Sequence, residues 1–229
     1  MPVTPLRIAV PGAEQTVSGD LTRDRASTRL LVLAHGAGAG YRHASMLAIS
    51  EALARRGVGT LRFNFPFTEA GRRRVDGQAL SVATILAALD AAGAAAPDLP
   101  LFLGGHSYGG RMASHAAVEH PLPVRGLVFC SFPLHPAKKP GVARAAHLRD
   151  VCLPMLFLSG TRDALARRDL LEGVLAGLGG RAHAHWLETA DHGYRVLKRT
   201  RTRDQDVFDE LAEAAAAFMD VASPAGRCV

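Results

Sequence analysis

A serine between two glycines, in the run Gly-His-Ser-Tyr-Gly at residues 105–109, constrains this chain more than any other feature. It follows the apolar residues 101–103 and precedes a segment with helical character. A sharp turn from strand to helix needs small residues on both sides of its tip, because a Cβ there would clash where strand and helix pass. Such pentapeptides also arise by chance in a chain with 23 glycines, so the prediction depends on this position. We predict a strained turn with Ser107 at its tip.

Short aliphatic runs alternate with longer Ala- and Leu-rich stretches along the rest of the chain. This alternation is typical of βα units that build a mainly parallel sheet. The predicted strands are Leu6–Val10, Thr16–Leu21, Arg29–Ala34, Val58–Phe65, Leu101–Gly104, Val124–Cys130, Met155–Leu158 and Ala182–Leu187, the first two as an antiparallel hairpin. The predicted helices are Ser45–Arg56, Gln78–Ala92, Gly109–Glu119, Val142–Arg149, Asp169–Leu178 and Asp204–Val221.

Length and composition indicate one globular unit. The 229 residues are 48% hydrophobic and 21% charged and contain no repeat or long linker, so we expect a single domain over residues 1–229. The net charge is +6, but the arginines are scattered and only 6% of residues are aromatic, so we expect no nucleic-acid partner. The N-terminus does not resemble a signal peptide, and no later segment approaches the ~18 apolar residues that cross a bilayer. We therefore expect a cytoplasmic protein with no membrane partner.

Two further polar side chains follow strands at the edge where open parallel sheets place their sites. Asp163 lies just beyond the seventh predicted strand, and His192 lies just beyond the eighth. A serine hydroxyl is a poor nucleophile until a base removes its proton, and a carboxylate must orient that base. We predict a catalytic triad of Ser107, Asp163 and His192, with Gly193 permitting a tight turn below the imidazole.

Other acidic and basic residues compete for these roles. Asp191 and Glu188 adjoin the histidine in sequence, but neighbours in a tight turn usually point apart, so they remain the less favoured acids. His183 and His185 alternate in a predicted strand and share one face, which would suit a metal. The sequence near them offers no third ligand, so we expect no metal site and no other cofactor.

The loop His-Gly-Ala-Gly-Ala-Gly at residues 35–40 follows the third predicted strand. Its backbone N–H groups could cradle a phosphate, but it lacks the Lys-Ser/Thr pair of a P-loop and the spacing of a dinucleotide fingerprint. In a serine hydrolase, such a loop and the residue after the nucleophile each supply one N–H to the oxyanion of the reaction. We predict an oxyanion hole formed by the N–H groups of Ala37 and Tyr108.

Together these motifs make the chain resemble the α/β-hydrolase superfamily over nearly its whole length. The resemblance implies an α/β-hydrolase fold, with a mostly parallel central sheet of seven or eight strands and helices on both faces. Within the superfamily the chain looks closest to small capless serine hydrolases related to dienelactone hydrolases, which implies that there is no cap domain. Dienelactone hydrolases use a cysteine where this chain has Ser107, so the resemblance does not extend to their substrate.

A finer resemblance concerns the segments 63–66, 71–74, 132–136 and 147–148. They look like a bacterial subgroup of predicted hydrolases, which is similar to the hydrolase-like subunit of the eukaryotic non-specific-lethal chromatin complex and to testis-expressed relatives. Two functions follow. The chain is either a serine hydrolase, carboxylesterase-like and acting on an ester or thioester, or an interaction module with an idle site. The intact set of Ser107, Asp163 and His192 favours the enzyme.

Two basic loops leave the predicted sheet at the edge that carries Ser107. Their cations are Arg72, Arg73, Arg74, Lys138 and Lys139. On the rim of an open cleft they would bind substrate and favour a small anionic acyl compound. The alternative is a solvated basic surface that pairs with Glu69 and Asp76. Residues 131–150 are too few for a cap, so we expect an open site unsuited to long lipid chains.

Overall fold

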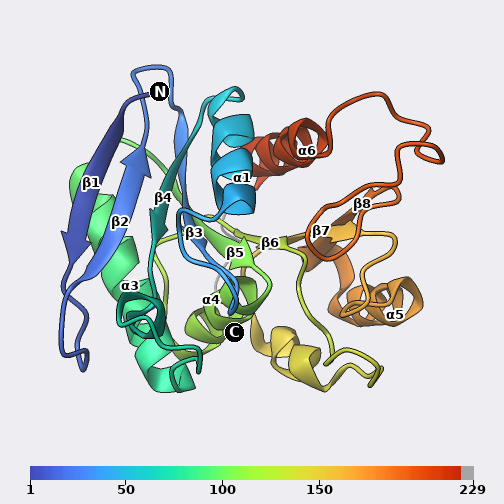
Figure 1. Cartoon of the computed structure of the whole chain (residues 1–229), viewed down its shortest axis with the longest axis horizontal. Coiled ribbons are helices and arrows are strands. Elements are labelled where there is room, and N and C mark those ends of the chain that lie inside the picture. The colour runs from blue at the N-terminus through green and yellow to red at the C-terminus, as the bar shows by residue number, and fades with distance from the viewer. Residues whose placement is uncertain (223–229) are drawn as a thin grey trace.

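In the computed structural model, which describes residues 1–222, one eight-stranded sheet runs through the protein (Figure 1). The strands are β1 (Val3–Ile8), β2 (Val17–Thr22), β3 (Arg29–Ala34), β4 (Val58–Phe63), β5 (Leu101–His106), β6 (Leu127–Cys130), β7 (Met155–Gly160) and β8 (Ala182–Leu187). Their order is β1-β2-β4-β3-β5-β6-β7-β8. Strand β2 is antiparallel to β1 and β4, and all other pairs are parallel. The predicted fold class is confirmed, including the opening hairpin and the lack of a cap domain within residues 1–222.

Helices cover both faces of the sheet (Figure 1). The α-helices are α1 (Ala44–Ala54), α2 (Pro66–Glu69), α3 (Gln78–Ala95), α4 (Tyr108–Glu119), α5 (Arg168–Leu178) and α6 (Val207–Val221), and the 3₁₀ helices are η1 (Ala143–Asp150) and η2 (Gly179–Arg181). Helices α1 and α6 share a core with one face of the sheet, and α3, α4 and α5 share a core with the other. The central strands are therefore apolar on both sides, as a buried parallel sheet requires.

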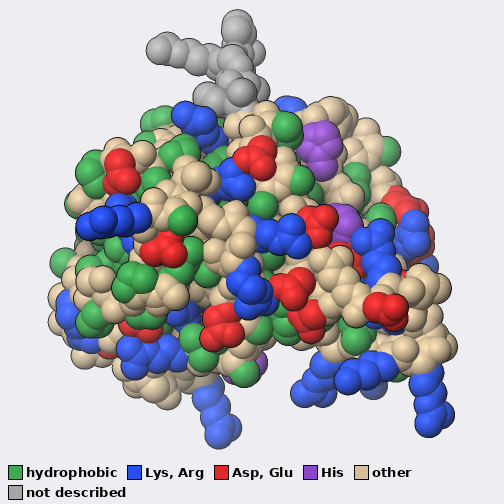
Figure 2. All heavy atoms as spheres, turned by 90° about the horizontal axis from the view of Figure 1, so that it is seen from above, with side chains coloured by type: hydrophobic (Ala, Val, Ile, Leu, Met, Phe, Trp, Pro, Cys, Tyr) green, Lys and Arg blue, Asp and Glu red, His purple; other side chains and the backbone are tan. Residues whose placement is uncertain are grey.

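Charged side chains of both signs join the helices at the surface. Arg55 at the end of α1 lies 2.6 Å from Asp209 of α6, and Arg56 lies 2.9 Å from Glu213. Figure 2 shows basic and acidic side chains intermixed across one face of the molecule. Many arginines of the described residues therefore form ion pairs with nearby carboxylates.

Several element boundaries differ from the predictions for identifiable reasons. Strand β6 begins at Leu127 rather than at Val124, although residues 125 and 126 already bond to β5. Helix α6 begins at Val207 because the Asp206 side chain accepts from the N–H groups of the first turn. The short helix α2 was not predicted. The carboxylate of Asp76, which follows α2 in the chain, accepts a hydrogen bond from the Phe67 N–H of this helix at 2.8 Å.

Helix α3 corrects the expectation that no segment approaches a membrane-spanning length. It has 18 residues with a mean hydropathy of 1.4, which is long and apolar enough to cross a bilayer. However, its residues Val82, Ile85 and Leu89 are buried in the core against the sheet, and its neighbour along that face is α4. Helix α3 is therefore a core helix of this fold.

Candidate active site

Ser107 lies in the turn between β5 and α4 with strained backbone angles, φ 51° and ψ −113°. A Cβ added at Gly105 would lie 2.6 Å from the backbone oxygen of Ala34 in β3, and one added at Gly109 would clash with the same oxygen. Real Cβ atoms do not approach backbone so closely, and both glycines are therefore required by the close packing of strand, turn and helix. This is the geometry that the pentapeptide predicts.

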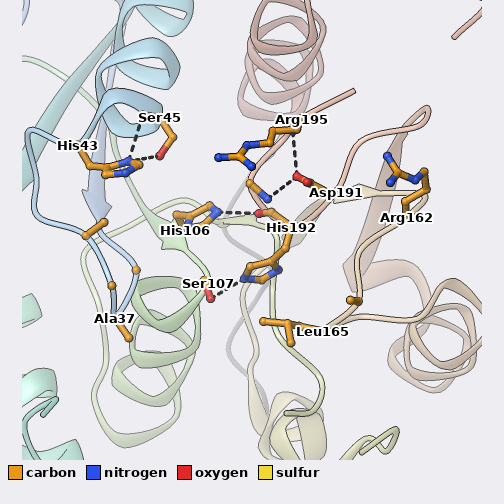
Figure 3. A pocket seen from close by; sticks show the side chains of 15 residues that line it. Ala37, His43, Ser45, His106, Ser107, Arg162, Leu165, Asp191, His192 and Arg195 are labelled. Carbon is orange, nitrogen blue, oxygen red and sulfur yellow. Dashed lines mark hydrogen bonds between the residues drawn. The ribbon is translucent and has the colours of Figure 1, made fainter. Parts of the chain in front are cut away.

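The structure brings Ser107, His192 and Asp163 together in one hydrogen-bonded series, of which Figure 3 shows the bond between Ser107 and His192. The His192 Nε2 atom lies 2.8 Å from the Ser107 Oγ atom, and its Nδ1 atom lies 2.8 Å from Asp163 Oδ2. A carboxylate only accepts, so Nδ1 carries the proton and Nε2 is free to accept the serine proton. The Asp163 side chain is fully buried, and its second oxygen accepts from the Leu165 N–H at 2.8 Å. The carboxylate is thus held in place behind the imidazole.

The two competing acids have other partners. The Asp191 Oδ1 atom accepts from the N–H groups of Gly193 and Arg195, each at 2.9 Å, and so closes the turn that carries the histidine. The Glu188 carboxylate accepts from the backbone and hydroxyl of Thr202. Of these three acids, Asp163 is the one whose carboxylate is hydrogen-bonded to the imidazole of His192.

The turn around His192 does not depend on the glycine at position 193, contrary to the prediction from the sequence. The residues with positive φ are Thr189 (57°) and Tyr194 (65°), and Gly193 is not among them. Tyr194 is buried, and its hydroxyl donates to the Leu158 oxygen of β7 at 2.9 Å. The glycine on which the turn depends is Gly160 at the end of β7, where a Cβ would clash with the Ala190 backbone. The proposed role of Gly193 in the turn is therefore corrected.

A buried histidine orients the loop after β3. His35 is fully buried, its Nε2 accepts from the Phe65 N–H at 3.1 Å, and its Nδ1–H donates to the Gly36 oxygen at 2.8 Å. Burial lowers the pKa of His35 to about 4, so the ring is neutral near pH 7 and keeps this pattern. Because a peptide unit is planar, fixing the Gly36 oxygen also fixes the Ala37 N–H, which points the opposite way.

The second predicted donor belongs to Tyr108, the first residue of α4. The N–H groups of a first helical turn have no acceptor inside the helix, so they are available to a ligand. The Tyr108 side chain packs into the protein, where its hydroxyl lies 2.7 Å from the Ser81 hydroxyl and donates to the Asp76 backbone oxygen at 3.2 Å. These bonds anchor the start of α4.

A pocket of about 620 Å³ opens beside Ser107 and His192 (Figure 3). Small residues of the loop after β3 line one side, and the turns that carry Asp163 and His192 line the other. The structure does not bring the five predicted rim cations into this lining. Arg72 pairs instead with the buried Asp76 at 2.7 Å, as the alternative interpretation expected, and Glu69 pairs with Arg7 rather than with that loop.

Four basic residues in the pocket lining were not singled out from the sequence: His43, His106, Arg162 and Arg195. Arg162 and Arg195 are exposed, and Arg162 also donates to the Thr189 oxygen. His106 stands inside the pentapeptide itself, so its position next to Ser107 was the available signal. Nothing in the spacing of the two arginines marked them.

The two histidines of β8 have separate surroundings. His185 Nε2 lies 2.8 Å from the Glu210 carboxylate of α6, which also pairs with Arg201 and Arg203. The His183 ring lies near that of Phe218. Over residues 1–222, no group of three or more His, Cys, Asp or Glu side chains could hold a metal ion.

The sequence matches the family described as alpha/beta hydrolase domain over residues 27–220. Among solved structures, the chain is similar to a dienelactone hydrolase from Anabaena variabilis, with a TM-score of 0.74, 20% identity and coverage of 95% of this chain and 98% of that one. It is similar to a serine hydrolase without a lid from Xanthomonas campestris (TM-score 0.72, 17% identity, 99% of each chain). It is also similar to the esterase Est1E from Butyrivibrio proteoclasticus (TM-score 0.70, 17% identity, 94% and 97%). At these identities the likeness is one of fold.

Proposed function

Because the chain belongs to the alpha/beta hydrolase family, we propose that it is a serine hydrolase that cleaves esters or thioesters with Ser107, His192 and Asp163 as its triad. The observation that supports this most is the unbroken series of two 2.8 Å hydrogen bonds from the strained serine to a buried carboxylate. The series opens onto a pocket that can admit a small acyl compound.

The reaction follows from this geometry. As the Ser107 oxygen attacks the acyl carbon, its proton passes to His192 Nε2, and Asp163 stabilises the imidazolium through Nδ1–H. The N–H groups of Ala37 and Tyr108 bind the oxyanion, and each such donor contributes about 2.7–4 kcal/mol. His192 then protonates the departing alcohol or thiol. Water, activated by the same histidine, cleaves the acyl-enzyme and releases the acid.

The test uses a fluorophosphonate probe and a short activated ester. Ser107→Ala should abolish labelling and lower kcat by about 10⁴–10⁶-fold. The matched control is Ser45→Ala, because Ser45 lines the same pocket but bonds to His43 instead of His192. Labelling that persists in Ser107→Ala would refute the assignment, and a wild-type protein that neither reacts nor hydrolyses would support the idle interaction module.

Our proposal for the substrate is a short, preferably anionic acyl group. The lining next to Ser107 consists largely of glycine and alanine from residues 36–39, with Leu165 opposite, and offers little apolar enclosure. The structural neighbours named dienelactone hydrolase and esterase are compatible with small substrates. Two sets of cations could attract an anion: the rim set of five, and Arg162 with Arg195 in the lining.

A pair of nitrophenyl esters, the acetate and the succinate half-ester, separates these two sets. If the lining is responsible, Arg195→Gln should raise KM for the anionic ester several-fold, whereas the triple variant Arg72→Gln, Arg73→Gln, Arg74→Gln should not. The reverse result would assign the effect to the rim, and added salt should imitate whichever variant is active. Equal KM values for both esters in the wild type would show that the charge of the substrate does not affect its binding.

The remaining expectations accompany this proposal. The chemistry needs no metal or other cofactor, so dialysis against a chelator should leave the rate unchanged. A cytoplasmic location and the finer likeness to the chromatin-complex subunit stay predictions. Cell fractionation tests the first, and recovery of chromatin proteins with a tagged chain would test the second.

A further inference from the structure

His106 joins the three segments of the site. Its Nε2 atom lies 3.0 Å from the backbone oxygen of His192, and the two imidazole rings lie 5.4 Å apart between centroids (Figure 3). On its other side, its Nδ1 atom would lie 3.1 Å from a Cβ at Gly36, so the ring packs tightly against the loop after β3. Its own backbone immediately precedes Ser107.

The direction of the bond to His192 is unambiguous. A carbonyl oxygen only accepts, so His106 Nε2 must carry the proton and donate it. Burial, partly offset by this hydrogen bond, lowers the pKa of His106 to about 4, and the ring is therefore neutral near pH 7. Its second nitrogen faces the loop after β3 as a lone pair.

This bond differs in kind from the others that hold the base. Asp191 closes the turn around His192 internally, and Tyr194 and Asp163 tie that turn to the β7 side of the sheet. Within residues 1–222, two hydrogen bonds connect residues 188–195 with the turn at Ser107. One is the His192–Ser107 bond, which the reaction itself breaks. The other is the bond from His106.

On the basis of the proposed function, we propose that His106 is a positioning residue for the reaction. Its N–H holds the His192 backbone in register with the turn at Ser107 while the proton passes between serine and imidazole. The substrate need not contact His106 for this role. A displacement of about 1 Å between reacting groups can lower a rate by about 10²-fold, so loss of the bond should affect kcat rather than KM.

The experiment replaces the donor and then restores it. His106→Phe keeps a flat ring but no N–H, and His106→Gln places an amide N–H where Nε2 stands. We expect His106→Phe to lower kcat for a neutral activated ester by about 10–100-fold with KM within about 3-fold, and to slow fluorophosphonate labelling by the same factor. His106→Gln should recover most of both rates.

Each outcome decides the proposal. If His106→Phe proves poorly folded by circular dichroism, His106→Asn serves instead, because its amide reaches only the Nδ1 position and should show the same loss. An unchanged kcat in the folded variant, or equal losses in the Phe and Gln variants at equal melting temperature, would overturn the positioning role. The proposed function fails separately, through Ser107→Ala in otherwise wild-type protein.

Discussion

The turn that carries Ser107 and the turn that carries His192 bring two halves of one site together, but they are stabilised in opposite ways. At Ser107 the geometry depends on two missing side chains, since the backbones of Gly105 and Gly109 lie against Ala34 with no space for a Cβ. At His192 the turn itself is held by side chains that are present, the carboxylate of Asp191 and the buried ring of Tyr194, although its start at Ala190 also lies against Gly160 of β7 with no space for a Cβ.

The two turns differ in how many interactions stabilise each of them. A steric requirement against backbone cannot be relaxed locally, so one added methyl group affects strand, turn and helix together. A turn held by several hydrogen bonds of about 1 kcal/mol each loses little when one is removed. We therefore expect single changes at the serine turn to be severe and single changes within residues 188–195 to be mild, with Gly160 of β7 as a steric exception and the acid Asp163 as a chemical one.

The largest expected effect tests that exception. Asp163→Asn should lower kcat by about 10³–10⁴-fold while the fold is retained, because the amide no longer stabilises the imidazolium. Asp191→Asn keeps an oxygen that can accept the N–H groups of the turn, so its loss should be below about 10-fold. Side-by-side kcat values check this. If the two variants exchanged ranks, Asp191 would be the acid.

The next largest effect is expected when a glycine of each turn is replaced by alanine, which adds one methyl group. Gly109→Ala should lower the free energy of unfolding by about 3 kcal/mol, because its Cβ meets the backbone of β3. Gly193→Ala should cost less than about 1 kcal/mol, since its nearest neighbour is the Asp191 carboxylate at 3.6 Å and its φ is not positive. Urea denaturation of both variants measures the difference. Similar losses would show that both turns are limited by backbone contact.

Acid should act mainly on the serine side of the site. Burial lowers the pKa of His35 and of His106 from 6.5 to about 4. As the pH falls from 6.5 toward 4, the unfolded chain binds protons that the folded protein excludes, so the free energy of unfolding decreases by up to about 1.4 kcal/mol per pH unit for each histidine. The slope is half of its maximum at the unfolded pKa of 6.5, and above about pH 7.5 the two groups contribute almost no pH dependence.

Urea denaturation between pH 4.5 and 7.5 checks this expectation. His106→Gln should flatten part of the slope, because the variant has no imidazole to protonate at that position. A stability that stays constant over this range would show that the two rings are not protected from protonation in the folded protein.

The smallest effect concerns one bond of the histidine turn. Tyr194→Phe removes the hydroxyl that donates to the Leu158 oxygen, but that oxygen also accepts from the Ser131 N–H at 2.9 Å. We expect a loss of about 1 kcal/mol in unfolding free energy and a kcat within about 3-fold of wild type. Thermal melting and ester hydrolysis measure both. A loss of unfolding free energy as large as that of Gly109→Ala would contradict the expectation that single changes in the histidine turn are mild.

Local sequence determined the parts of the protein in which neighbours along the chain set the geometry. The strand Arg29–Ala34 was predicted with its exact bounds, because a short, nearly continuous apolar run is typical of a strand buried on both faces. The strained turn at Ser107 was predicted because glycines at two fixed positions mark a close passage of strand and helix, although the backbone that makes both glycines necessary is that of Ala34 in β3. Ser107, Asp163 and His192 were expected to lie close together because each follows a predicted strand, and parallel strands end at one edge of the sheet.

Tertiary structure decided what depends on residues that are distant in sequence. Helix α3 has the composition of a membrane-spanning segment, and only the sheet against which it packs makes it a core helix. Glu69 was considered from the sequence as a partner of the nearby basic loop, but the fold pairs it with Arg7, 62 residues away. His106 was visible as a letter in the pentapeptide, but its bond to His192, 86 residues away, exists only because β5 and the turn after β8 end side by side at the same edge. A sequence pattern records which groups are available, whereas their partners are selected by packing.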